Sequence, residues 1–452
     1  MTTINQTTTA GSPFSKRVVR RFAINVASLF SVHIANYLLP LLTVPFVVRI
    51  IGPERLGLLQ FSQAYIAYFT LLINFGFDMA GVRKVAAHRE DKALVNRIFS
   101  EILVGKALLL LVSCLIFAFI SVSRADFNRY FILHLSTFIS CFGTVFFPIW
   151  LYQAMEDLGR VALFQLGIKL LFTCSVFLII RQPDDYIYYN LSLSIAHVIV
   201  SGLALFRAFR RFNLLFKFPS FQELRDRFSQ DSILFYSSIT ITLYSSSNVF
   251  LLGLLSTPYH VGIFSAGTRL EAIARSFVGL ALNQALFPIM ARAFGESPEK
   301  GLKIIRTAFF PLLLVLICIS LCLWFIAPYF ITVFYGKQFS EAESVLRLVS
   351  ILPVTIGISN LLGIHTMLNL KMDKPFFLIT VFGSLIGLVL NVILIREYTH
   401  TGVAYAWVAS EIFITLAMYF FLVYQRVQVI QPALLFRLYN YGKIRLTLYL
   451  TK

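Results

Sequence analysis

Long, mostly apolar runs alternate along the whole chain with short segments that carry most of the charge. A helix needs about 20 apolar residues to cross the hydrocarbon layer of a membrane, and the runs have that length. Tolerating isolated charges inside them, we predict spans at residues 22–48, 56–80, 98–123, 130–152, 161–180, 186–207, 232–255, 262–290, 307–332, 344–370, 375–395 and 402–425. The pattern predicts an all-α polytopic membrane protein of about twelve helices. No connecting segment is long enough to fold as a catalytic domain.

The longest connecting segment divides the predicted spans into two sets of six. This basic linker, residues 208–231, separates an N-terminal lobe (22–207) from a C-terminal lobe (232–425). A tail at 1–21 precedes the first lobe, and a basic tail at 426–452 follows the second.

A short motif repeats at the same place in the two halves. Pro53–Gly57 follows the first span, and Pro258–Gly262 follows the seventh. Six spans per half, each set starting from the same side, would be parallel repeats related by an axis along the membrane normal. We therefore expect two pseudo-symmetric lobes around a central cavity, the arrangement of a transporter.

The composition agrees with a membrane location. Hydrophobic residues make up 58% of the chain and charged residues 13%, against about 25% charged residues in soluble domains. The net charge of +18 does not indicate a nucleic-acid partner, because the Lys and Arg residues form short clusters between apolar runs. A groove-binding protein would need a continuous basic stripe.

The distribution of basic residues predicts the orientation. If the amino end is cytoplasmic, the cytoplasmic segments hold 27 of the 39 Lys and Arg residues, and the opposite loops hold 7. Cytoplasmic loops collect Lys and Arg, so we expect both termini in the cytoplasm of a bacterial inner membrane. The first apolar run is longer than the core of about 7–15 residues in a signal peptide, and we expect it to remain as a span.

Basic residues inside the spans are candidates for a binding cavity, since a charge near mid-bilayer costs about 2.5–3.5 kcal/mol. Arg269 has no acidic residue four positions away, and a free guanidinium can hold a phosphate group with two hydrogen bonds. Arg275 follows Glu271 by four residues, the spacing of an intrahelical ion pair, so a ligand role for Arg275 is one of two alternatives. Lys106 and Lys169 can either line the cavity or extend back to the headgroups.

Acidic residues and prolines inside the spans add further candidates. Glu411 has no cation three or four residues away, and Asp78 lies near the end of the second span. We expect either inter-helix pairing or ion coupling for both. Pro40 and Pro45 each remove a backbone donor from the first span, and interrupted helices are tolerated where they line a cavity. We predict a hinge there.

Features that catalysis would require are missing from the sequence. It has no Gly-rich phosphate loop, no metal-ligand spacing and no outer loop with clustered carboxylates. We expect neither an enzyme nor a bound metal or cofactor.

Several segments resemble the bacterial polysaccharide repeat-unit (O-antigen, Wzx-type) flippases. They are Val44–Gly57, Phe75–Lys84, Tyr152–Asp157 and the stretch from Ser265 to Met290, which is also similar to lipid II flippases. The resemblance covers nearly the whole chain. It implies the fold of the multidrug/oligosaccharidyl-lipid/polysaccharide exporter superfamily, with two six-helix lobes around a V-shaped cationic cavity. It also implies transfer of an undecaprenyl-diphosphate-linked oligosaccharide from the inner to the outer leaflet by alternating access.

The resemblance also implies roles for individual residues. In the lipid II flippases an arginine at the place of Arg269 lines the cavity, and Arg83 belongs to a Gly-then-Arg pattern that we assign to the cytoplasmic gate. Those relatives carry further arginines in the first span, whereas this chain has none between Arg21 and Arg49. The other candidates for the diphosphate are therefore Lys106, Lys169 and Arg275.

Two other functions stay open. A cation-coupled multidrug antiporter of the same superfamily could use Glu411 and Asp78 with the 46 Phe residues. A membrane glycan polymerase is disfavoured by the short outer loops. For the flippase we expect the lipid-linked oligosaccharide and membrane lipids as partners, with a polysaccharide polymerase and a chain-length regulator as further candidates. An ion gradient or the membrane potential would drive the cycle.

Overall fold

The computed structural model of the chain describes residues 16–280, 282 and 286–430, so most of both predicted tails lies outside it. Within the described residues the backbone is helical apart from short connections, and no β-strand occurs. This is the secondary structure expected in lipid, where each backbone amide must be satisfied within its own segment or in a closed barrel.

The helices follow one another with short connections. The first half contains α1 (Lys16–Asn74), α2 (Phe77–Ala87), α3 (Lys92–Ser123), α4 (Ala125–Arg129), α5 (Phe131–Phe138), α6 (Ser140–Phe146), α7 (Ile149–Ala154), α8 (Leu158–Ile179), η1 (Pro183–Asp185) and α9 (Tyr186–Arg211). The second half contains α10 (Phe221–Leu255), α11 (Pro258–Leu280), α12 (Phe287–Glu296), α13 (Pro298–Phe330), η3 (Ile331–Tyr335), η4 (Lys337–Phe339), α14 (Ala342–Val349), α15 (Leu352–Leu362), η5 (Gly363–Met367) and α16 (Asp373–Tyr424).

Two of the long helices contain a sharp break and therefore provide two passes each. In α1 the break is at Gly52, with φ 77° and ψ 175°, a conformation that suits glycine because it has no Cβ. In α16 it is at Thr399, with φ 50° and ψ −121°. By length and composition, eight helical segments of the described chain can cross a membrane. With the two breaks and the shorter helices, the predicted fold of about twelve spans is confirmed.

Some predicted spans are less regular than expected. The predicted fourth span, residues 130–152, consists of α5, α6 and α7, which meet at Ile139 and Pro148. Pro148 has no amide hydrogen to continue a helix. Of the predicted linker, only residues 212–220 lie outside a helix, because α9 ends later and α10 begins earlier than the apolar pattern indicates.

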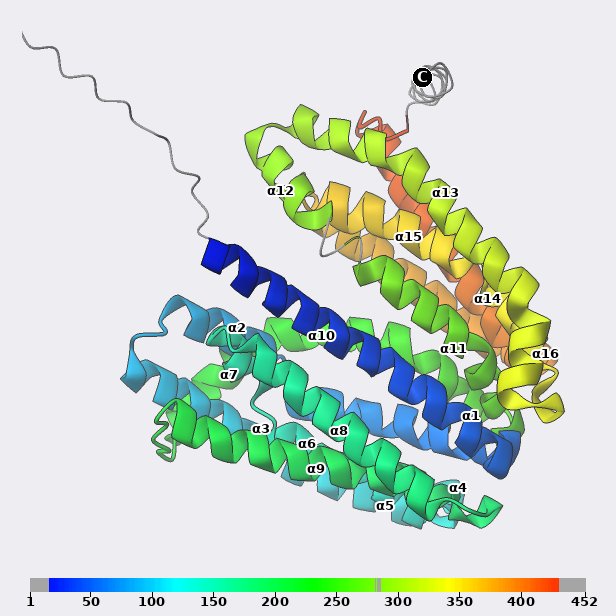
Figure 1. The fold of residues 1–452 in the computed structure, drawn as a ribbon, viewed down its shortest axis with the longest axis horizontal. Coiled ribbons are helices and arrows are strands. Elements are labelled where there is room, and N and C mark those ends of the chain that lie inside the picture. The colour runs from blue at the N-terminus through cyan, green and yellow to red at the C-terminus, as the bar shows by residue number, and fades with distance from the viewer. Residues whose placement is uncertain (1–15, 281, 283–285, 431–452) are drawn as a thin grey trace, which may run out of the picture.

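The helices form two lobes that touch at one end of the bundle (Figure 1). Helices α1–α9 make the first lobe and α11–α16 the second, while α10 packs against α1 and α16. Direct contact between the lobes is mainly that of α1 with α11, η3 and η4. We call this the seam end. The ribbons diverge toward the other end, where α2 finishes and α3, α10 and α13 begin (Figure 1). We call that the basic end.

The largest apolar cluster lies across the seam. It joins Val47, Ile51 and Leu59 of α1 to Val261 and Phe264 of α11, all nearly inaccessible to solvent. In a membrane, helices associate through close packing rather than through the hydrophobic effect. Contact between the lobes therefore depends on how closely these two helices can approach.

Candidate functional site

The repeated motif forms the closest contact between the lobes. Gly57 and Gly262, the last residues of the two motifs, face each other where α1 meets α11. A Cβ atom on Gly57 would lie 1.7 Å from the carbonyl oxygen of Pro258, and one on Gly262 would lie 1.9 Å from that of Pro53. No side chain fits at either position, so the two glycines allow the backbones to touch.

Further contacts close the seam end. The Arg49 guanidinium donates to the backbone carbonyl of Val333 in η3. The Gln338 amide donates to the carbonyls of Val48 and Arg49, at 3.4 and 3.5 Å. These bonds join α1 of the first lobe to η3 and η4 of the second.

Two basic side chains from opposite lobes lie within electrostatic range of each other near the seam. Arg269 lies on α11, about two helical turns from Gly262, and its side chain is exposed. Lys169 lies half-buried on α8 of the first lobe, close enough to Arg269 for electrostatic repulsion. Both are predicted cationic residues, and they come from opposite lobes. An anion between them would replace their repulsion by two attractions.

The surroundings of Arg269 are polar and partly unsatisfied. Arg269 lines a small inter-lobe cavity of about 30 Å³ together with Gln60, Tyr189, Ser265 and Tyr335. The Ser265 hydroxyl is buried and has no hydrogen-bond partner among the described residues. A buried polar group without a partner is uncommon in proteins, so this hydroxyl is available to a ligand.

The other two predicted cations have acidic partners of their own. The Lys106 side chain is only 2% exposed, and its Nζ lies 2.7 Å from Oδ1 of Asp78 on α2. Arg275 donates to Glu271 at 2.9 Å, as the four-residue spacing predicts, and its guanidinium lies 5.5 Å from the ring centre of Trp407. Each of these two cations therefore has a carboxylate within ion-pair distance, and a role of either in binding a ligand stays a prediction.

Glu411 is buried in α16. Within the described part of the chain, no cation lies within ion-pair distance of its carboxylate. An unpaired ionised carboxylate in an apolar interior is very costly, so the group must take up a proton or meet a cation. The structure does not distinguish between the two roles predicted for Glu411, whereas it pairs Asp78 with a neighbouring helix.

The predicted hinge and gate residues are placed as follows. Pro40 and Pro45 both lie within α1, whose backbone departs from helical geometry at Gly52. Arg83 lies on α2 with an exposed side chain. Their roles as hinge and gate stay predictions.

A larger cavity, of about 570 Å³, lies in the first lobe beside α10. Its lining includes Gln63, Thr70, Asn74, Asp78, Thr137, Ser140, Asn190, Ser194 and Ser246. Gln63 donates to Asn190, which donates to Thr137, both at 2.8 Å. The Asn74 side-chain oxygen is buried without a partner among the described residues.

The sequence analysis did not single out these cavity residues, although a signal was present. Gln63, Thr70 and Asn74 are spaced by seven and four residues, which places them on one face of a helix. Hydroxyl and amide groups along one helix face suit the hydroxyl groups of a sugar.

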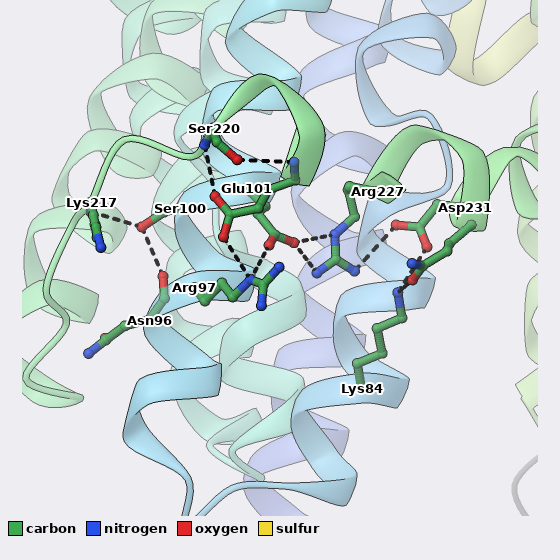
Figure 2. Close-up of polar contacts among 11 residues, drawn as sticks. Lys84, Asn96, Arg97, Ser100, Glu101, Lys217, Ser220, Arg227 and Asp231 are labelled. Atoms are coloured by element: carbon green, nitrogen blue, oxygen red, sulfur yellow. Dashed lines mark hydrogen bonds and ion pairs between the residues drawn. The ribbon is translucent and has the colours of Figure 1, made fainter. Parts of the chain in front are cut away.

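The basic end carries a buried ionic cluster that attaches α10 to the first lobe (Figure 2). Glu101 of α3 accepts hydrogen bonds from Arg97 and from Arg227 of α10, each at 2.8 Å. Nζ of Lys84 on α2 lies 3.4 Å from Oδ1 of Asp231 on α10. Because Glu101, Arg227 and Asp231 are nearly inaccessible, the first turns of α10 are fixed to α2 and α3.

The linker is bound to α3 beside this cluster. The backbone amides of Leu215 and Lys217 donate to Asn96 and Ser100 of α3. The backbone amide of Ser220 donates to Glu223 and thereby lowers the pKa of that carboxyl group. The linker that connects the lobes therefore runs along the surface of the first lobe.

Comparison with known proteins supplies the family context. The profile of the family described as "Polysaccharide biosynthesis protein" matches residues 22–294. A "Putative O-antigen transporter" of Escherichia coli (strain K12) is 27% identical over 397 residues, which are 88% of this chain and 95% of the relative.

Two solved structures share the fold. The lipid II flippase MurJ in an inward closed conformation has a TM-score of 0.63 and 14% identity, with 86% of this chain and 87% of MurJ covered. An inward-facing multidrug resistance MATE family transporter of the MOP superfamily has a TM-score of 0.64 and 16% identity, with 87% and 94% covered.

Proposed function

The chain belongs to the polysaccharide biosynthesis protein family, and from this premise we propose that it is a flippase for a lipid-diphosphate-linked oligosaccharide. The observation that carries the proposal is the inter-lobe cavity lined by Arg269 of the second lobe, with Lys169 of the first lobe within electrostatic range of that arginine. A substrate with a diphosphate next to the lipid presents concentrated negative charge, and arginine and lysine are the side chains that bind it.

The two lobes would bind different parts of this substrate. The diphosphate would lie between Lys169 and Arg269, close to the buried Ser265 hydroxyl. The sugar units would enter the larger cavity of the first lobe, where the side-chain oxygen of Asn74 has no partner among the described residues. The lipid tail would remain in the surrounding membrane. We propose undecaprenyl diphosphate as the carrier, in agreement with the O-antigen named for the Escherichia coli relative.

The shape of the molecule fits the first half of an alternating-access cycle. We propose that the basic end faces the cytoplasm of a bacterial inner membrane, with both termini on that side. The structure would then be the inward-facing state, with the outer side closed at Gly57 and Gly262. Substrate binding between the lobes would pull them together at the basic end and open the seam end.

Return of the empty protein needs a driving force. We propose that Glu411 couples the cycle to an ion gradient, because it is a buried carboxylate without a described partner. Rocking would also bend α10, whose first turns are fixed to the first lobe while its later part packs against α16. Partners such as a polysaccharide polymerase and a chain-length regulator belong to this proposal as candidates.

A cation-coupled multidrug antiporter is the second candidate. The fold shared with a MATE transporter and the buried Glu411 favour it. Two neighbouring cations between the lobes would repel a cationic drug, however, and for this reason we favour the flippase. For a glycan polymerase we find no supporting side-chain arrangement among the described residues, and we propose that the protein is not an enzyme.

The proposal can be tested by complementation of a strain that lacks the gene. We expect Arg269→Ala to abolish surface polysaccharide at normal protein levels in the membrane, with lipid-linked repeat units accumulating on the inner leaflet. Arg292→Ala, at an exposed arginine of α12, should leave the polysaccharide unchanged. Normal polysaccharide with normally expressed Arg269→Ala would refute the proposal, and loss of drug resistance alone would favour the antiporter.

A further inference from the structure

Three potential metal ligands converge at the seam end of the second lobe. They are His260 near the start of α11, Glu341 between η4 and α14, and His400 just after the break in α16. One ligand atom from each lies within 4.8 Å of the other two. The sequence analysis predicted no metal site, because these residues are far apart in the sequence and no local spacing connects them.

The two imidazole rings are oriented toward each other. Nδ1 of His260 lies 2.9 Å from Nδ1 of His400, and Nε2 of His400 lies 3.9 Å from a carboxylate oxygen of Glu341. His400 is almost completely buried, while half of the Glu341 side chain is exposed. An ion could therefore enter past the carboxylate and be held from the inner side by the two rings.

The backbone next to His400 is strained. Thr399 has a φ of 50°, which is a rare conformation for a β-branched residue. The turn is also tight, because a Cβ on Gly402 would lie 2.2 Å from the carbonyl oxygen of Leu394. Strained residues of this kind persist where the surrounding structure holds them, and they cluster at functional sites. Here the strained turn directs His400 toward His260.

The chemistry of the three side chains selects the type of ion. Two imidazoles and one carboxylate, with a further position open to solvent, are a donor set typical of zinc. In a tetrahedral zinc site the ligand atoms are about 3.4 Å apart, and here one ligand atom from each of the three residues lies within 4.8 Å of the other two. Calcium and magnesium prefer oxygen ligands throughout, so the histidines favour a transition metal.

We propose that His260, Glu341 and His400 bind a zinc-class divalent ion that stabilises the second lobe where it meets the first lobe at the seam. His260 is part of the motif that ends at Gly262, so an ion on His260 also fixes the segment that touches the first lobe. The ion would connect the start of α11 to the turn before α14 and to the break in α16. This site is separate from the proposed substrate site and does not depend on the flippase proposal.

The test uses the full-length protein, purified in detergent and treated with a chelator. The background carries Cys318→Ser and Cys322→Ser, because these exposed cysteines of α13 can also bind zinc. Titration calorimetry with zinc chloride should show one ion per chain. Replacing a ligand in Glu341→Gln or in the His260→Ala/His400→Ala double variant should weaken binding by about tenfold or more.

Thermal unfolding provides the second measurement. Zinc should raise the melting temperature of the parent protein by several degrees and leave that of the double variant unchanged. The matched control is His88→Ala, at an exposed histidine after α2, which should behave like the parent. Absence of zinc binding to the parent, or binding by Glu341→Gln and by the double variant as tight as that of the parent, would overturn the site. Binding without any shift in melting temperature would overturn its role in stabilising the second lobe.

Discussion

Gly57 and Gly262 occupy equivalent places in the two lobes, and each prevents the other from carrying a side chain. A Cβ on Gly57 would lie 2.9 Å from the amide nitrogen of Gly262, and a Cβ on Gly262 would lie 3.1 Å from that of Gly57. This reciprocity follows from the pseudo-symmetry of the motif. If the lobes rock, this contact must break and form again in every cycle.

A larger residue at the seam should therefore hold it open. We expect Gly57→Val to favour the outward-open state and to abolish transport. A cysteine at Ser265, placed in a background without native cysteines, would report this by reacting with a membrane-impermeant maleimide added from the outside. The control is Gly279→Val on α11, where a Cβ meets no atom within 4 Å. Equal labelling of the two variants would argue against the seam as a gate.

Substitution of Asn74 can distinguish a role in substrate binding from a role in protein stability. Its unpartnered oxygen contributes nothing to folding, so we expect Asn74→Ala to leave the melting temperature unchanged or slightly raised while polysaccharide export falls. Asn190→Ala should instead destabilise the protein, because Asn190 connects Gln63, Thr137 and the carbonyl of Leu59. Normal polysaccharide export by Asn74→Ala would show that the substrate does not depend on the first-lobe cavity.

The pair of Lys106 and Asp78 should behave as a structural ion pair. Asp78→Asn leaves a buried ammonium without a counter-charge, and we expect it to cost about 3 kcal/mol of unfolding free energy. The double variant Lys106→Met/Asp78→Asn should recover most of that loss. Thermal or denaturant unfolding in detergent measures both. If the double variant were as unstable as Asp78→Asn, the pairing would not explain the effect.

Among the residues of the basic end, substitution of Glu101 should cost the most unfolding free energy. Glu101→Gln removes the carboxylate that Arg227 contacts with both Nε and a terminal nitrogen. We expect a loss of about 3 kcal/mol, because a buried guanidinium loses one of its counter-ions. Glu90→Gln, an exposed glutamate in the turn before α3, should be neutral. Equal melting temperatures for the two variants would show that the cluster does not hold α10 in place.

Local sequence patterns were sufficient for the fold because the membrane imposes them. Apolar runs must be long enough to span the bilayer, and Lys and Arg are concentrated in every second connecting segment. These two patterns were enough to predict the twelve-span fold from the sequence. The break at Gly52 and the contact at Gly57 also coincide with the motif in the sequence.

The composition of the site could not be predicted, because it depends on contacts between distant helices. Lys106 and Arg269 look alike in the sequence: each is a cation inside a span without an acidic residue four positions away. Only the packing of α2 against α3 gives Lys106 a counter-ion, and only the packing of the lobes brings Arg269 close to Lys169. The proposed metal ligands His260, Glu341 and His400 were missed for the same reason.

The central claim is that Lys169 and Arg269 together hold the diphosphate during transfer between leaflets. The most direct test reconstitutes the protein in vesicles that contain a fluorescent undecaprenyl-diphosphate oligosaccharide and follows its movement between leaflets with a membrane-impermeant reagent. We expect Lys169→Ala and Arg269→Ala each to slow the initial rate by about tenfold, equivalent to about 1.4 kcal/mol, while Arg292→Ala stays normal. Unchanged rates in both alanine variants would contradict the account.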